Sequence, residues 1–308
     1  MGCILESHSL SCPRKRKVRT NQTNAVSNPG KKIRKSSGKE VRYSEKKLRR
    51  SLMRSGADAQ TVDSIVATLG EELYEGMTTR EIHNRAFALL RAAQNTFASR
   101  YKLKNAIYEL GPTGFPFEKF ISALLNHSGY QTETNREFQG ACVRHEIDVV
   151  ARNGDSLTLI ECKFHSEHGR NCSVRIPLYI HSRYRDVAAG PSVSGAGQGV
   201  LKPAWVVTNT RFTSDALAYG KCSGMYLLSW GHPRGNALKD RIDRHRLYPI
   251  TVSVLLSARE KQFLLEREVV LGRQLLRAPH FLDHLGVSDN RKGRIIKEFE
   301  ALCGKKDK

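Results

Sequence analysis

The chain has 308 residues, 39% of them hydrophobic, and a formal net charge of +21. No run of about 18 or more apolar residues occurs, so we expect no membrane span and no membrane partner. The start of the chain lacks a secretory signal, and the seven cysteines are scattered without a C-x-x-C pair, which favours a reducing, cytoplasmic location. The basic surplus favours phosphate-rich partners such as nucleic acid, while a basic protein without such a role stays open.

Residues 1–30 are predicted to be a disordered basic tail, because they are rich in Ser, Thr and Asn and show no hydrophobic period. The basic run from Pro13 to Arg19 resembles a nuclear-import signal. A basic arm that lies on nucleic acid is the open alternative.

Residues 31–105 are predicted to form a mostly helical domain. Two short strands are expected around a turn at Gly38, and Ser44 is placed to cap the first helix. Apolar residues at helical spacing and a Thr-x-x-Glu capping box predict three more helices. They lie at about 59–74, from Thr78 with Glu81, and through Phe97, Tyr101 and Ile107.

This stretch resembles the ATP-cone, a regulatory nucleotide-binding module. Three segments carry the resemblance: Lys35-Ser36-Ser37-Gly38 at the turn, Tyr43-Ser44-Glu45-Lys46-Lys47-Leu48 at the helix start, and Phe97-Ala98-Ser99-Arg100-Tyr101 at the end. The resemblance implies that Lys35, Gly38 and Lys47 bind ATP or dATP. Two mobile ammonium groups and a glycine that admits close backbone approach suit phosphates. Lysines that merely face solvent are the alternative.

Residues 106–235 are predicted to be an α/β domain with helices flanking a central mixed sheet. The Gly111-Pro112-Thr113-Gly114 stretch is expected to be the linker into it. The expected order is a helix at 117–125, a strand at 130–137, a hairpin at 145–163, a helix at 174–187, a loop at 188–200, a strand at 204–209, a helix from Thr213 to Tyr219 and a strand at 225–230.

The hairpin carries the main candidate site. With Asn153-Gly154 as a two-residue loop, side-chain alternation places Asp148, Glu161 and Lys163 on one face. Asp148 and Glu161 would then be diagonal neighbours, about 7–8 Å apart at Cβ. Because two adjacent carboxylates repel, a hard divalent cation with oxygen ligands is expected between them. A turn or salt-bridge role for Asp148, and a plain surface pair for Glu161 and Lys163, are the alternatives.

The element order and these residues together resemble the Mrr-like branch of the PD-(D/E)xK restriction-endonuclease superfamily. The matching pieces are Phe117-Glu118, Gly129-Tyr130, Glu146-Ile147-Asp148, Ile160-Glu161-Cys162-Lys163 and Phe212-Thr213. The resemblance implies that Asp148, Glu161 and the backbone carbonyl of Cys162 bind Mg²⁺. It also implies a catalytic role for Lys163 and for Glu118, although Glu118 as a surface helix charge stays open.

Other polar residues follow the hairpin. His165 and His168 lack the ligand spacing of a zinc site, so phosphate contact or loop packing is favoured. Four arginines could follow a DNA backbone or form a solvated helix face. They are Arg170, Arg175, Arg183 and Arg185.

Residues 236–308 are predicted to be a C-terminal helical segment. A helical cap on the preceding domain, or a dimer surface, is favoured over a helix–turn–helix at 281–294. The whole chain is therefore expected to be a Mg²⁺-dependent endonuclease on double-stranded DNA in restriction or defence, regulated by ATP or dATP, and a homo-oligomer. A nucleotide-responsive DNA-binding regulator that no longer cuts is the alternative.

Overall fold

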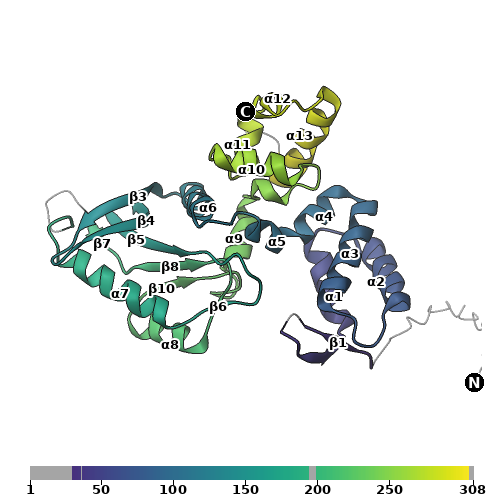
Figure 1. Cartoon of the computed structure of the whole chain (residues 1–308), viewed down its shortest axis with the longest axis horizontal. Helices are drawn as coiled ribbons and strands as arrows, with labels where there is room; N and C mark the ends of the chain where they lie inside the picture. Colours follow the sequence, from purple (N-terminus) through teal and green to yellow (C-terminus); the bar gives the residue numbers. More distant parts are fainter. Residues whose placement is uncertain (1–29, 36, 194–198, 305–308) are drawn as a thin grey trace, which may run out of the picture.

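The computed structural model describes residues 30–35, 37–193 and 199–304, which form three bodies (Figure 1). A helical N-terminal body and a sheet body lie at opposite ends, and the C-terminal helices sit between and above them. The predicted basic tail falls outside the described residues except for Gly30. The mixed α/β class with a mixed central sheet is as predicted.

The N-terminal body begins with a short antiparallel pair, β1 (Lys32–Arg34) and β2 (Glu40–Arg42). Four helices follow: α1 (Glu45–Arg54), α2 (Ala59–Glu72), α3 (Thr79–Ala93) and α4 (Asn95–Tyr101). The capping box of Thr78 with Glu81 is confirmed, with both reciprocal hydrogen bonds present. The expected cap by Ser44 is wrong: Ser44 precedes α1, but its side chain makes no capping hydrogen bond.

The predicted fourth helix is two helices, because its halves belong to different cores. Lys102, with ψ near 2°, separates α4 from α5 (Leu103–Tyr108). Ala98 of α4 packs into the N-terminal core with Leu52 and Leu90, whereas Ile107 of α5 packs into the core of the sheet body. A single straight helix could not direct the apolar residues of its first half into one core and those of its second half into the other.

The sheet body has the strand order β10-β8-β5-β4-β3, with the short β7 (Val200–Leu201) also paired to β5. Its main strands are β3 (Gln131–Gln139), β4 (Arg144–Asn153), β5 (Ser156–Lys163), β8 (Trp205–Thr208) and β10 (Tyr226–Leu228). β3, β4 and β5 are antiparallel, whereas β5, β8 and β10 are parallel. A further parallel pair, β6 (Asn171–Cys172) with β9 (Arg211–Phe212), was not expected from the sequence.

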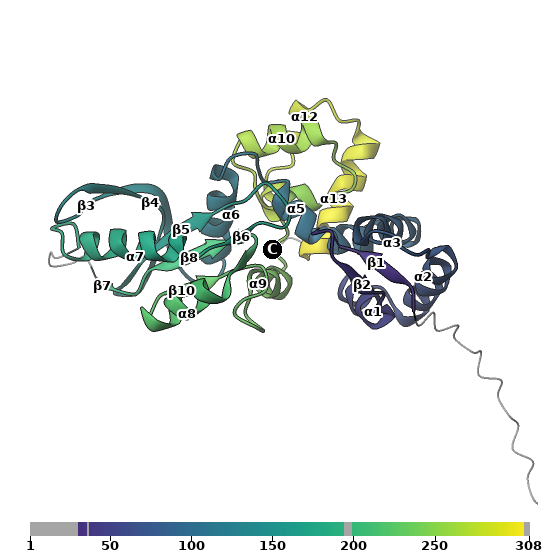
Figure 2. The ribbon, with the colours of Figure 1, turned by 60° about the horizontal axis from the view of Figure 1, so that its bottom comes forward.

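Helices cover both faces of this sheet. On one face lies α6 (Phe115–Asn126), whose apolar residues at helical spacing, Phe117, Phe120, Ile121 and Leu124, are fully buried. On the other face lie α7 (Arg175–Ala188) and α8 (Ser214–Cys222), which follow the sheet side by side in both views (Figure 2). The predicted helices and their order are therefore confirmed.

The C-terminal helices extend the same core. They are α9 (Leu238–His245), the 3-10 turn η1 (Ile250–Val252), α10 (Ala258–Glu266), α11 (Gly272–Arg277), α12 (Phe281–His284) and α13 (Asp289–Cys303). Leu264, Leu275 and Phe299 join α5, α6 and one face of the sheet in a single hydrophobic cluster. The interpretation as a helical cap is therefore confirmed.

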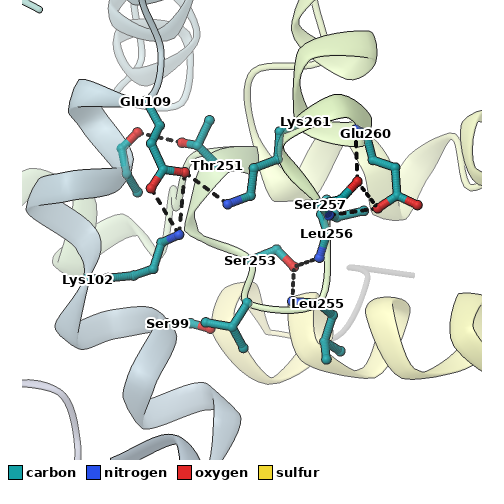
Figure 3. A network of polar contacts seen from close by, with 12 residues as sticks. Ser99, Lys102, Glu109, Thr251, Ser253, Leu255, Leu256, Ser257, Glu260 and Lys261 are labelled. Atoms are coloured by element: carbon teal, nitrogen blue, oxygen red, sulfur yellow. Dashed lines mark hydrogen bonds and ion pairs between the residues drawn. The ribbon is translucent and has the colours of Figure 1, made fainter. Parts of the chain in front are cut away.

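Polar contacts connect the N-terminal body to this cap. Buried Glu298 of α13 accepts hydrogen bonds from Ser99 Oγ of α4 at 2.7 Å and from the Val254 N–H at 2.9 Å, and from Ser253 Oγ. Figure 3 shows the neighbouring network, in which Lys102 and Lys261 both reach the carboxylate of Glu109. The two bodies are thus joined by buried, directional bonds.

None of the helices in the described ranges is long and apolar enough to cross a membrane.

Candidate functional site

The β4–β5 hairpin differs in register from the expected one. Gly154 and Asp155 form the loop, Asn153 pairs with Ser156, and Val150 pairs with Leu159. The prediction of an Asn153-Gly154 loop was wrong, because Gly154 takes the first loop position with φ of 53° while Asn153 stays extended. The difference is two residues, so every side chain keeps its predicted face. Continued by one pair, this register sets Asp148 directly opposite Glu161.

The ladder is irregular on both sides of Asp148. Pairing with β5 stops at Val149, and pairing with β3 skips Asn135, which has φ of 54°. The Cys162 N–H donates to the side chain of Asp148, at Oδ2 and 2.7 Å, in place of a main-chain carbonyl of β4. In an antiparallel strand the N–H and C=O of one residue point to the same edge, so the Cys162 carbonyl also lies toward Asp148.

Glu161 lies half-buried beneath α7 and is held by an arginine. Arg183 Nη1 donates to Glu161 Oε2 at 2.7 Å, and Arg183 Nη2 donates to the carbonyl of Glu146. The guanidinium also lies over the Tyr179 ring, 5.6 Å from its centroid. Burial raises the pKa of Glu161 to about 7, and the charge of Asp148 adds to this, while Arg183 and Lys163 oppose it.

Glu118 of α6 lies near Asp148 and Glu146. Burial raises the pKa of its carboxyl, and the charges of Asp148 and Glu146 add to the effect. The Asn135 amide donates to Glu118 Oε2 at 3.4 Å and to Glu146 Oε1 at 3.1 Å, so it separates these two carboxylates. Burial likewise raises the pKa of Asp148, against the Cys162 hydrogen bond and Arg183.

Lys163 completes the predicted set. It is exposed at the carboxyl end of β5, beside Thr208 of β8, and its charge lowers the pKa of both Asp148 and Glu161. The structure therefore brings Asp148, Glu161 and Lys163 together, and Glu118 approaches Asp148 from α6. It adds Asn135 and Arg183 to them. Asn135 carries a recognisable signal, because Asn tolerates positive φ better than most residues.

The site is an open edge, not a deep pocket. A cavity of about 10 Å³ between Glu161, Arg183, Tyr184 and Ile180 has room for about one water molecule. Within the described ranges, no three His, Cys, Asp or Glu side chains are grouped closely enough to hold a metal ion. The predicted Mg²⁺ ligands do not depend on such a group, because they are the side chains of Asp148 and Glu161 and the backbone carbonyl of Cys162.

The loop after β5 is fixed by packing. Asn209, fully buried, accepts from the His165 N–H at 2.9 Å and donates to the His165 carbonyl at 2.8 Å. The His168 ring lies 3.9 Å from the Tyr108 ring, centroid to centroid. The His168 ring therefore packs on α5, whereas the His165 contacts are made by its main chain. Phosphate contact by either histidine stays a prediction, and the role of Asn209 was not foreseen.

The predicted nucleotide residues lie at one end of the N-terminal body. The Gly38 N–H donates to the Lys35 carbonyl at 2.9 Å, and Gly38 has φ of 78°, so the predicted glycine turn is present. Lys35 and Lys47 are both exposed. A cavity of about 300 Å³ in this body lies elsewhere, between α2 and α3, and is lined by residues such as Thr61, Thr68 and Leu89.

Comparison with known proteins gives a family. Residues 248–303 match the family model described as AF1548-like, C-terminal. An "Uncharacterized protein" of Archaeoglobus fulgidus is 30% identical over 185 residues, which is 60% of this chain and all of that protein. The solved structure "Crystal Structure of Protein of Unknown Function AF1548" is 28% identical, covers 62% of this chain and 99% of its own, and superposes with a TM-score of 0.51. Because the chain is 30% identical to the Archaeoglobus fulgidus protein over that protein's whole length, it belongs to the AF1548-like family.

Proposed function

We propose that the protein is a Mg²⁺-dependent endonuclease that hydrolyses phosphodiester bonds in double-stranded DNA. The observation that carries the proposal is that Asp148 comes opposite Glu161 where β4 and β5 separate, with Lys163 at the end of β5 and Glu118 near Asp148. Acids whose pKa values are raised by burial and by each other are typical of functional sites. The arrangement agrees with the resemblance to Mrr-like PD-(D/E)xK nucleases.

The donor set suits a magnesium ion. Asp148 and Glu161 offer oxygen ligands, and the Cys162 carbonyl lies at the same edge. Burial raises the pKa of both acids despite the charges of Arg183 and Lys163, so a further cation between them would stabilise their ionised forms. Bound there, Mg²⁺ would polarise the scissile phosphate and stabilise the leaving oxygen.

The remaining residues have distinct roles in this proposal. Lys163, exposed beside the acids, orients the attacking water and offsets the charge of the phosphate. Arg183 positions Glu161 from α7, and Asn135 keeps Glu118 and Glu146 apart. Burial raises the pKa of Glu118, which makes this carboxyl a stronger proton acceptor than an exposed carboxylate and suits it to a role in proton transfer.

The N-terminal body is proposed to regulate this activity by binding ATP or dATP through Lys35, Gly38 and Lys47. Two features support this. The glycine turn of the ATP-cone resemblance is present, and the body is joined to the cap through the buried Ser99–Glu298 bond. A change in the N-terminal helices would therefore reach α13 directly.

A non-cleaving, nucleotide-responsive DNA-binding regulator is the second candidate. It is favoured by the Arg183–Glu161 ion pair, which places an internal cation against one of the metal-binding acids. The two candidates differ in a single measurable property, since the regulator binds DNA without cutting it under any divalent cation.

Plasmid nicking with and without Mg²⁺ tests the proposal, using wild type, Lys163→Ala and, as a matched control, Lys221→Ala on the exposed surface of α8. We expect Lys163→Ala to reduce cleavage about 100-fold or more and the control to leave it unchanged. Equal cleavage by wild type and Lys163→Ala would refute the site. No cleavage by wild type, with DNA bound, would support the regulator.

The nucleotide role is tested by calorimetry with ATP and dATP on wild type and the double variant Lys35→Ala/Lys47→Ala. We expect wild type to release or absorb heat on binding nucleotide and the double variant to show no binding. We also expect the nucleotide to change the rate of plasmid cleavage by wild type. Undiminished binding by the double variant would remove Lys35 and Lys47 from the site.

A further inference from the structure

Five basic residues lie on elements that come together where the N-terminal body adjoins the sheet body. We define the junction cluster as Arg80 at the start of α3, Lys104 of α5, His168 after β5, Arg211 of β9 and Lys239 of α9. They come from five elements that are far apart in the sequence. Both views place α5, β6 and α9 close together between the sheet and the N-terminal helices.

Specific contacts hold these elements together. The parallel pairing of β6 with β9 sets Asn171 beside Arg211 and so draws the loop after β5 to that strand. The stacking of His168 on Tyr108 ties the same loop to α5. The Leu238 N–H donates to the Ser229 carbonyl at 3.0 Å, which fixes the start of α9 against the strand end. The cluster is therefore part of the folded architecture.

Lys104 of the junction cluster differs from Lys102 and Lys261 in having no acidic partner. Lys102, at the end of α4, and Lys261 of α10 share the carboxylate of Glu109. Lys104 is largely buried, and its pKa is lowered by burial, by Arg211 and by Lys239, with no carboxylate among the causes. The pKa of His168 is lowered in the same way, by burial, Lys104 and Arg80.

The acids nearest to Lys239 in sequence form ion pairs with another cation. Asp240, which follows Lys239, accepts from Arg54 of α1, as does Asp243 on the next turn of α9. Among the described residues, no ion pair joins a carboxylate to Lys104, Arg211 or Lys239. Positive charges that repel one another, among them the part-buried Lys104, are stabilised by a bound anion.

The position of the cluster relates it to the proposed active site. His168 follows Lys163 beyond the carboxyl end of β5, and Arg211 follows Thr208 beyond the carboxyl end of the paired strand β8. Both therefore lie at the edge of the sheet where Asp148 and Glu161 face Lys163. The charge of Arg80, at the start of α3, contributes to the lowered pKa of His168 and so relates the N-terminal body to this loop.

We propose that the junction cluster is a phosphate-binding site in which Lys104, Arg211 and Lys239 bind phosphate oxygens. The proposal deepens the proposed function and rests on it. The phosphate comes either from a DNA backbone that extends from the active site toward the N-terminal body, or from a free adenine nucleotide. Three positive groups from three elements can surround one phosphate, as a single surface lysine cannot.

The test uses the full chain with Lys104→Gln, Arg211→Gln and Lys239→Gln combined. The control combines Arg91→Gln, Lys221→Gln and Arg277→Gln, which remove the same charge from exposed positions elsewhere. Binding of a short DNA duplex is measured by fluorescence anisotropy over a salt series in EDTA, and binding of ATP by calorimetry. Circular dichroism verifies folding, and the single variant Arg211→Gln, at an exposed position, serves if the triple variant unfolds.

We expect the cluster variant to weaken DNA binding about 10-fold or more and to reduce the salt slope by about 3, beyond any effect of the control. Loss of ATP binding in place of DNA binding would also support the site and identify a free nucleotide as the source. Equal loss by both variants, or no loss, would overturn the proposal. Plasmid cleavage by wild type is measured in parallel with Mg²⁺. If wild type cleaves while the cluster variant binds DNA and ATP normally, the phosphate site has failed and the nuclease function has not.

Discussion

Glu161→Gln provides a direct test of the electrostatics of the acidic site. Burial raises the pKa of Glu161 from 4.5 to about 7, so the folded protein holds this proton more tightly than the unfolded chain. Stability associated with the protonated carboxyl is complete below pH 4.5 and is lost as the pH rises through about 7. At about 1.4 kcal/mol for each tenfold change in proton affinity, the full loss is about 3 kcal/mol.

Glutamine keeps the shape of the side chain and removes this ionisation. We expect Glu161→Gln to have little effect on the free energy of unfolding near pH 5 and to raise it by about 1–3 kcal/mol at pH 8.5. The loss of the charged partner of Arg183 accounts for the lower end of this range. Urea denaturation of both proteins at the two pH values measures the difference.

Glu71→Gln, at an exposed position of α2, is the matched control and should show no such dependence on pH. The reasoning would be refuted if Glu161→Gln destabilised the protein more at pH 8.5 than at pH 5. That result would mean that Arg183 and Lys163 fully compensate the buried charge, and that the site has no need for a further cation.

Two more predictions concern the helical cap. Gly272→Ala should destabilise by about 1–3 kcal/mol, because its Cβ would lie 2.2 Å from Cδ1 of the fully buried Phe299. Gly293→Ala, at an exposed position of α13 where an added Cβ would have no atom within 4 Å, should be neutral or stabilising in the same urea titration. An equal loss of stability in both variants would contradict the packing argument. Glu298→Ala should cost about 2–4 kcal/mol and weaken amide-exchange protection of α4, because Ser99 and two other buried donors lose their acceptor. Unchanged exchange in α4 would show that the Ser99 bond does not hold the two bodies together.

Local rules and alternation determined much of the fold from sequence alone. The capping box at Thr78, the buried stripe of α6 and the strands around the hairpin follow from side-chain spacing within one element. The shared face of Asp148, Glu161 and Lys163 was also predictable. It depends on a period of two residues, which survived the two-residue error in register.

What joins distant segments was decided only by the tertiary structure. The break between α4 and α5 arises because two cores compete for one predicted helix. Arg183 meets Glu161 only when α7 packs across the sheet, and the junction cluster forms only when five separate elements converge. Sequence periodicity reports which face of an element is apolar, but not which partner that face will meet, and the charge balance of the acidic site depends on those partners.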